Sequence, residues 1–251
     1  MTIFFKSTRP DGTDFYTGEV DYGAALVSGE SVTAPVIGLA NDLTFPGPSW
    51  LHLATVPTEC VGMTWPCRLF EVEPVGDVFM DNSHPHKIGA RSVRVLREID
   101  AHRVFGPQGE QVAALIERCR TLSAVEAYCL GAGAARDAAR DAARDAARDA
   151  ARVAAWVAAW EASWDAIWDA IWDAIWAARS TARDAARDAT RAAGDAARDA
   201  TRAAGDAAGA LLCRDLIGQY DGWDQDAYDL LTCPWRDVIG PIHPDDGDSD
   251  E

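Results

Sequence analysis

Large residues recur at every fourth position from Arg136 to Trp176, and small residues, mostly alanine, fill the positions between them. Alanine is the strongest helix former, and neither glycine nor proline interrupts the stretch. The pattern therefore predicts a helix. The repeated residues are five arginines followed by six tryptophans: Arg136, Arg140, Arg144, Arg148, Arg152, Trp156, Trp160, Trp164, Trp168, Trp172 and Trp176.

The tryptophans should follow a spiral around this helix, because a four-residue step advances by about 40° at 3.6 residues per turn. A hydrophobic period longer than 3.6 favours a partner that wraps with a right-handed twist. The tryptophans are either buried against the protein's own helices or form the contact surface of a homo-oligomer or of a helical protein partner. The candidate interaction residues are the six tryptophans together with Ile167, Ile171 and Ile175.

Acidic residues recur once per turn within the tryptophan stretch, at Glu161, Asp165, Asp169 and Asp173. Each acid at bilayer depth costs about 2.5–3.5 kcal/mol, so we do not expect the segment to cross a membrane. A helix lying on a membrane surface stays an alternative, although such helices usually carry basic residues on their polar face.

In the arginine part, an aspartate stands three residues before most of the arginines, an arrangement that supports a helix by a few tenths of a kcal/mol per pair. We expect a solvated, self-paired face there. Further on, Thr190–Ala200 and Thr201–Leu211 repeat with a period of eleven, which predicts a nearly straight helix. An unbroken rod over 124–217 would measure about 140 Å, and a helical hairpin is the alternative. The glycines of this part mark a close helix neighbour or a break: Gly194, Gly205 and Gly209.

Residues 1–106 predict a small domain with a mixed or antiparallel sheet, because its strands follow one another without a regular helix between them. The whole chain is therefore expected to be α+β, with a long Ala/Trp-rich helical element after the sheet domain. Most of Gly23–Pro48 is interpreted as loop. The expected strands are Thr2–Lys6, Phe15–Val20, Val32–Ile37, Trp50–Val56, Arg68–Val75 and Ser92–Ile99, with a turn after Pro57.

The predicted domains are 1–106, a helical region 107–217, and an aromatic C-terminal segment 218–251. Gly109–Arg120 has amphipathic helical spacing, and Ser123 with Glu126 forms a capping box that starts the next helix at about Ala124. The C-terminal aromatics should pack back onto the chain, since they would otherwise form an exposed apolar patch. Further expectations there are a short helix at Asp226–Leu231, a turn starting at Pro234 and a disordered acidic end at Asp245–Glu251.

Three motifs of the N-terminal domain carry a resemblance: Ser-Trp-Leu-His-Leu-Ala-Thr at 49–55, Arg-Leu-Phe-Glu-Val-Glu-Pro-Val-Gly-Asp at 68–77, and Lys-Ile-Gly-Ala-Arg-Ser-Val-Arg-Val-Leu-Arg-Glu at 87–98. Together they resemble an uncharacterised domain family of phage and bacterial proteins. The Ala-Arg-Asp tract resembles those of actinobacterial and actinophage proteins in composition. The resemblance implies a phage or actinobacterial source.

The net charge is −17, and no region is basic, so the chain lacks the usual electrostatic footprint of a nucleic-acid-binding protein. Six scattered cysteines, with no Cys-x-x-Cys pair and no signal peptide, predict a reduced cytoplasmic setting, which would be the host cytoplasm for a phage protein. A zinc site is a minor alternative, with the candidate ligands Cys60, Cys67, His84 and His86. It is minor because the spacing of these residues fits no standard zinc-ligand pattern.

Candidate chemistry is confined to His52 on one expected strand and to Glu71 and Glu73 on another. The arrangement of these three residues resembles how ADP-ribosyltransferase-like domains place a histidine and a glutamate around NAD. The alternative is that Glu71 and Glu73 simply lie on the solvated face of their strand, which alternation alone would produce. No P-loop, dinucleotide-binding glycine pattern or nucleophile elbow is present. We expect a non-enzymatic interaction or scaffold protein without a cofactor, with the enzyme and the membrane-surface effector as alternatives.

Overall fold

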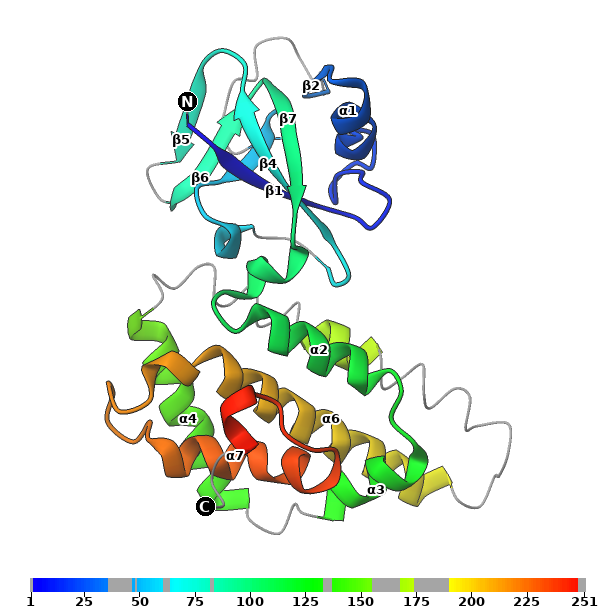
Figure 1. Cartoon of the computed structure of the whole chain (residues 1–251), viewed down its shortest axis with the longest axis vertical. Helices are drawn as coiled ribbons and strands as arrows, with labels where there is room; N and C mark the ends of the chain where they lie inside the picture. The colour runs from blue at the N-terminus through cyan, green and yellow to red at the C-terminus, as the bar shows by residue number, and fades with distance from the viewer. Residues whose placement is uncertain are drawn as a thin grey trace. The chain divides into compact units, whose positions relative to one another are not determined.

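The computed structural model divides the chain into two compact units, residues 1–106 and the described residues from Pro107 onward (Figure 1). It describes residues 2–35, 47, 49–60, 64–81, 84–132, 137–154, 168–173 and 190–247. Each unit has a hydrophobic core of its own.

The first unit is built on a seven-stranded sheet with the order β2-β7-β4-β1-β3-β6-β5, in which neighbouring strands are antiparallel. The expected α+β class is therefore confirmed, and the sheet is antiparallel. The elements are β1 (Phe4–Thr8), α1 (Tyr22–Ser28), β2 (Ser31–Thr33), β3 (Leu51–Ala54), η1 (Pro57–Glu59), β4 (Arg68–Pro74), β5 (Val78–Asp81), β6 (His84–Ala90), β7 (Ser92–Ile99) and η2 (Ala101–Phe105).

The core of this unit lies between the sheet and α1, which packs beside β7 (Figure 1). Tyr22, the first residue of α1, stacks on Phe70 of β4 with ring centroids 6.3 Å apart. The helix begins at Asp21, whose carboxylate accepts the Ala24 N–H at 2.8 Å, and ends at Gly29, whose φ of 74° suits glycine. We had interpreted this segment as loop, and that interpretation was wrong.

The strand expected at Phe15–Val20 is also wrong, and Asp14 is the physical reason. Its carboxylate accepts the backbone N–H groups of Tyr16 at 2.9 Å, Thr17 at 2.7 Å and Val20 at 3.1 Å. These bonds curl the segment into a closed loop, because a side chain that satisfies local donors competes with sheet formation.

The second unit is helical. Its helices are α2 (Gly109–Cys119), α3 (Ala124–Ala132), α4 (Asp137–Ala154), α6 (Thr190–Leu212) and α7 (Gln225–Val238), with a helical segment at 168–173 and 3-10 turns η3 (Arg214–Leu216) and η4 (Pro244–Gly247). The expected capping box is confirmed: the Glu126 N–H donates to Ser123 Oγ at 3.2 Å, and the Ser123 N–H donates to Glu126 Oε2 at 2.8 Å.

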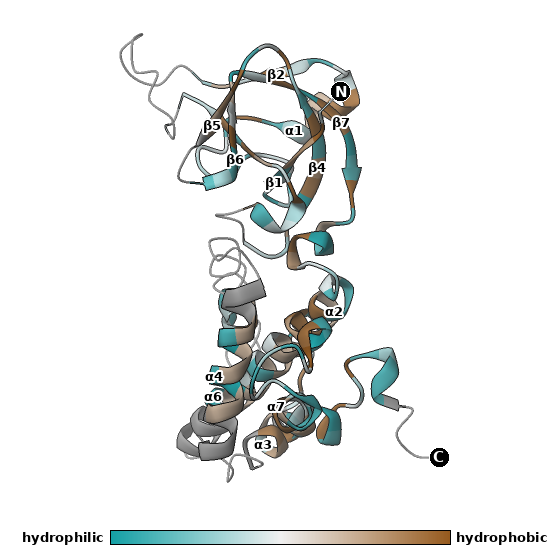
Figure 2. Ribbon diagram, turned by 90° about the vertical axis from the view of Figure 1, so that its left-hand side faces the viewer, coloured by the Kyte–Doolittle hydropathy of each residue, from teal (hydrophilic) through white to brown (hydrophobic). Residues whose placement is uncertain are grey.

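The C-terminal aromatics pack back onto the helical region, as expected. Trp223, Tyr228 and Trp235 are each at most 2% exposed, and Trp223 donates its indole N–H to the Cys213 carbonyl at 2.8 Å. The small faces of α4 and α6 leave room for these rings, and Figure 2 shows α7 as part of this unit. The alanines that meet the aromatic cluster are Ala143, Ala147, Ala150 and Ala210.

The long helical rod is not confirmed, because α4 packs against α6. Arg144 of α4 donates to Asp206 of α6 at 2.6 and 2.7 Å, whereas one straight helix would separate these residues by about 93 Å. The chain therefore folds back between α4 and α6. The expected self-paired face holds for Arg148, which binds Asp145 at 3.2 Å, and is wrong for Arg144, whose side chain is only 18% exposed.

Two expectations for the C-terminal segment were also wrong. Pro234 does not start a new turn, because it lies buried inside α7. The expectation of a disordered acidic end is wrong for residues 245–247, which belong to η4: Asp245 binds Arg214 at 2.7 Å, and Asp246 accepts the Tyr228 hydroxyl at 3.3 Å. The rest of that expectation, 248–251, lies outside the described residues.

Candidate functional site

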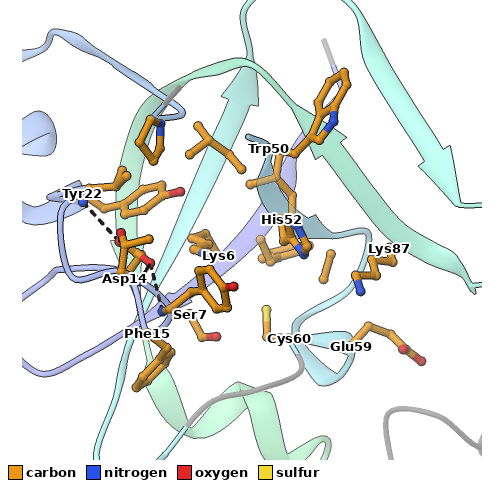
Figure 3. A pocket seen from close by; sticks show the side chains of 18 of the residues that line it. Lys6, Ser7, Asp14, Phe15, Tyr22, Trp50, His52, Glu59, Cys60 and Lys87 are labelled. Atoms are coloured by element: carbon orange, nitrogen blue, oxygen red, sulfur yellow. Dashed lines mark hydrogen bonds between the residues drawn. The ribbon is translucent and has the colours of Figure 1, made fainter. Parts of the chain in front are cut away.

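The first unit contains a cavity of about 550 Å³ at the place where two neighbouring strands separate (Figure 3). β1 and β3 share only the pair Phe5–Ala54, so Lys6 and Ser7 do not pair with the β3 residues that would otherwise face them. The gap between the strands opens the cavity, which is lined by Phe5, Lys6 and Ser7 of β1 and by Leu51, His52, Leu53 and Ala54 of β3. We call it the β1–β3 cavity.

Lys6 lines the β1–β3 cavity, and its side chain is partly buried. Burial lowers the pKa of Lys6, because a charged ammonium loses its hydration there, and the nearby Asp14 carboxylate opposes this shift only in part. The ammonium nitrogen lies 5.6 Å from the centre of the Tyr22 ring. Among the described residues, Lys6 has no ion-pair partner.

Asp14 stands at the same end of the cavity with its oxygens already occupied. Burial alone would raise the pKa of Asp14, but hydrogen bonds from Thr17 and Val20, together with the charge of Lys6, hold it below its ordinary value. Asp14 is therefore ionised at neutral pH. It shapes the loop that walls the cavity and adds a negative charge near Lys6.

Tyr22 contributes a hydroxyl that points into the cavity (Figure 3). The residue is 0% exposed, and its hydroxyl has no hydrogen-bond partner in the described part of the chain. Burial raises the pKa of Tyr22 well above its ordinary value, and Asp14 adds to the shift. The hydroxyl therefore stays protonated and can donate a hydrogen bond, and a buried donor without an acceptor is uncommon in native proteins.

The cavity is also lined by His52, Glu59, Cys60 and Lys87. Burial lowers the pKa of His52, whose Nε2 lies 3.1 Å from the Gly47 carbonyl oxygen, so the ring is neutral at neutral pH. Burial raises the pKa of Cys60 to about 12, although Lys6 and hydrogen bonds from Ser7 oppose the shift. A thiol held protonated in this way is a poor nucleophile.

The structure does not bring His52 together with the glutamates that were grouped with it. His52 lines the β1–β3 cavity, but Glu71 and Glu73 do not, because β1 lies between β3 and β4. Glu71 accepts two hydrogen bonds from Arg97, both at 2.8 Å, and these hold the pKa of Glu71 below its ordinary value. Glu73 lies 3.6 Å from Arg94.

The four residues of the zinc alternative do not converge either. Cys60 contacts Ser7 in the cavity wall, while His86 Nδ1 lies 2.7 Å from the Thr55 hydroxyl. In the part of the chain that the structure describes, no three side chains of the metal-binding types gather around one point.

Three of the candidate interaction residues fall within the described segment 168–173. Trp168 lies against Gly205 of α6, Ile171 is 0% exposed and Trp172 is 47% exposed. The segment thus packs partly inside its own unit. The other six candidates lie outside the described residues: Trp156, Trp160, Trp164, Ile167, Ile175 and Trp176. None of the described helices has the length and apolar character needed to cross a membrane.

The residues that sequence reasoning missed are Lys6, Asp14, Tyr22 and Lys87. The sequence held a signal for Lys6 and Lys87, because these two are the only lysines among the 23 basic residues. Both lysines line the β1–β3 cavity. The other 21 of the 23 basic residues are arginines.

Comparison of the chain with protein-family models, curated proteins and solved structures gave no match. The resemblance of the N-terminal domain to a phage and bacterial family therefore stays a prediction.

Proposed function

We propose that the first unit binds a small organic molecule in the β1–β3 cavity. The observation that carries the proposal is the buried Tyr22 hydroxyl, which faces the cavity without an acceptor among the described residues. The volume of about 550 Å³ falls within the range of about 300–1,000 Å³ typical of ligand sites, which combine apolar walls with a few placed polar groups.

The arrangement favours a ligand with an apolar body and one acceptor group. Val20, Leu51 and Leu53 provide apolar wall, while Lys6 and Tyr22 place two donors at one end. A buried donor without an acceptor costs about 1–3 kcal/mol, and a ligand carbonyl or carboxylate oxygen would recover that energy. Asp14 cannot serve as the acceptor for Tyr22, because it is bound to the neighbouring loop.

Calorimetric titration of the full chain with a panel of small carboxylic acids, aldehydes and ketones tests the proposal. Tyr22→Phe keeps the ring and removes only the hydroxyl, so the Kd of a bound member should rise about tenfold, or 1.4 kcal/mol. Tyr128→Phe is the matched control, because Tyr128 lies in the second unit and is 64% exposed. If no member binds, or if Tyr22→Phe binds as tightly as the wild type, the proposal is wrong.

A second proposed function is self-association through the tryptophan repeat. One observation favours it: Trp172 is 47% exposed although the neighbouring Ile171 is fully buried, so the segment presents a large apolar ring beside its packed face. Sedimentation equilibrium of the full chain should give an oligomer that Trp172→Ala weakens. A wild-type monomer at all concentrations would exclude this function.

A further inference from the structure

We infer that Lys6 forms a reversible imine with the carbonyl carbon of a small aldehyde or ketone held in the β1–β3 cavity. This inference rests on the proposed ligand-binding function and specifies the class of its ligand. The structural basis is the shared placement of a partly buried primary amine, Lys6, and a buried hydroxyl, Tyr22, whose ring centre lies 5.6 Å from the Lys6 nitrogen in the same cavity.

The amine of Lys6 is suited to act as a nucleophile. Only the neutral amine carries a free electron pair, and burial lowers the pKa of Lys6 toward that form. No described carboxylate forms an ion pair with it that would hold the proton. Asp14 lies near enough to stabilise a positive charge but has its oxygens bound by loop N–H groups.

The choice of residue supports covalent chemistry over simple charge pairing. Where the described chain needs a cation for a carboxylate, it uses arginine, as in Arg68–Glu98, Arg97–Glu71 and Arg144–Asp206. Arginine gives a permanent charge and bidentate bonds, whereas lysine gives a titratable primary amine. A cavity that only attracts an anion could have used arginine, as the rest of the chain does.

Tyr22 is the proton donor that the addition needs. Its hydroxyl points into the cavity, and its ring lies 5.6 Å from the Lys6 nitrogen. Because burial and Asp14 raise the pKa of Tyr22, the hydroxyl keeps its proton until a stronger base forms beside it. The oxygen of a carbonyl group under attack is such a base.

The reaction balances without an oxidant or a further reactant. The Lys6 electron pair forms a bond to the carbonyl carbon, the π electrons move to oxygen, and that oxygen takes the Tyr22 proton. The new ammonium nitrogen returns a proton to Tyr22, which leaves a carbinolamine. Tyr22 then donates its proton to the hydroxyl group, which leaves as water while the nitrogen electron pair forms the C=N bond, and the resulting iminium nitrogen returns its proton to Tyr22. One amine and one carbonyl thus give one imine and one water.

Reductive trapping on the full chain tests the inference, with benzaldehyde, propanal and pyruvate as probes and sodium borohydride as the trapping reagent. The chain has few amines, namely Lys6, Lys87 and its N-terminus, so peptide mass spectrometry assigns each adduct. We expect the reduced adduct on Lys6. Lys6→Arg should abolish this adduct, and in Tyr22→Phe the adduct should form more slowly. Tyr128→Phe is the matched control, because it removes the same hydroxyl from an exposed ring of the second unit, and it should leave the Lys6 adduct unchanged.

The outcomes separate the inference from the proposed function. If calorimetry shows a probe bound but borohydride traps no adduct, or labels Lys6 and Lys87 equally, the imine is refuted and ligand binding stands. If no member of the calorimetric panel binds, both the imine and the proposed ligand-binding function are refuted. Should circular dichroism show that Lys6→Arg does not fold, the ratio of Lys6 to Lys87 labelling in the wild type decides the question.

Discussion

A substitution at Gly205 tests whether the helical segment 168–173, which carries Trp168, packs against α6. Gly205 lies in α6, and a Cβ atom added there would stand 2.6 Å from Cη2 and 2.7 Å from Cζ2 of the Trp168 ring. Carbon atoms in favourable contact lie about 3.5–4.0 Å apart, so Gly205→Ala must move the ring or push the two helical segments apart.

Two opposing terms decide the sign of the effect. Alanine is favoured over glycine in a helix interior by about 1 kcal/mol, whereas overpacking a fitted contact costs about 1–3 kcal/mol. We therefore expect Gly205→Ala to destabilise the folded chain by about 1 kcal/mol. In a Trp168→Ala background the clash is gone, and the same substitution should stabilise by about 1 kcal/mol.

Urea denaturation followed by far-UV circular dichroism measures all four members of this double-mutant cycle. The coupling energy between the two positions should be about 1–3 kcal/mol, because residues in contact do not behave additively. Equal stabilisation by Gly205→Ala in both backgrounds would refute the placement of Trp168 on α6, and the segment would then have to be covered by another surface.

Three further predictions concern single residues. Because the pKa of Lys6 is lowered in the folded chain, the unfolded chain binds more protons between that pKa and the ordinary value of 10.5. The free energy of unfolding of the wild type relative to Lys6→Met should therefore rise with pH in this window, and urea titrations from neutral pH upward would show it. Arg144→Met removes the ion pair that Arg144 makes with the buried Asp206 carboxylate and should cost about 3–5 kcal/mol in the same assay, with Arg144→Met/Asp206→Leu recovering part of the loss. Ser123→Ala removes a helix cap and should cost about 1 kcal/mol, whereas Ser123→Asp should cost less.

Local signals predicted much of the fold. Strands β3, β4 and β7 were expected from their alternation, and the capping box between Ser123 and Glu126 was readable from four residues. A signal of the same kind was present for α1, because Asp21 is its N-cap residue and Gly29 is its C-cap residue. The glycine and serine residues around it favour a loop and hide this signal.

The candidate site could not be predicted in the same way. The β1–β3 cavity exists because two strands separate after the single pair Phe5–Ala54, and the members of that pair are far apart in sequence. No local pattern shows where a strand pair ends. His52 could be singled out because it interrupts an apolar strand, whereas Lys6 follows two phenylalanines and gives no such sign on its own.

Arg144 shows a different limit, which comes from the repeats themselves. The arginine repeat offers each arginine a nearby aspartate, so local spacing predicts that all of them are self-paired. The eleven-residue repeat likewise gives Asp195 and Asp206 the same neighbours, Gly-Asp-Ala-Ala. Identical local contexts cannot specify different partners. The pairing of Arg144 with Asp206 is set by where the chain folds back, which brings a partly exposed arginine of α4 to a buried carboxylate of α6.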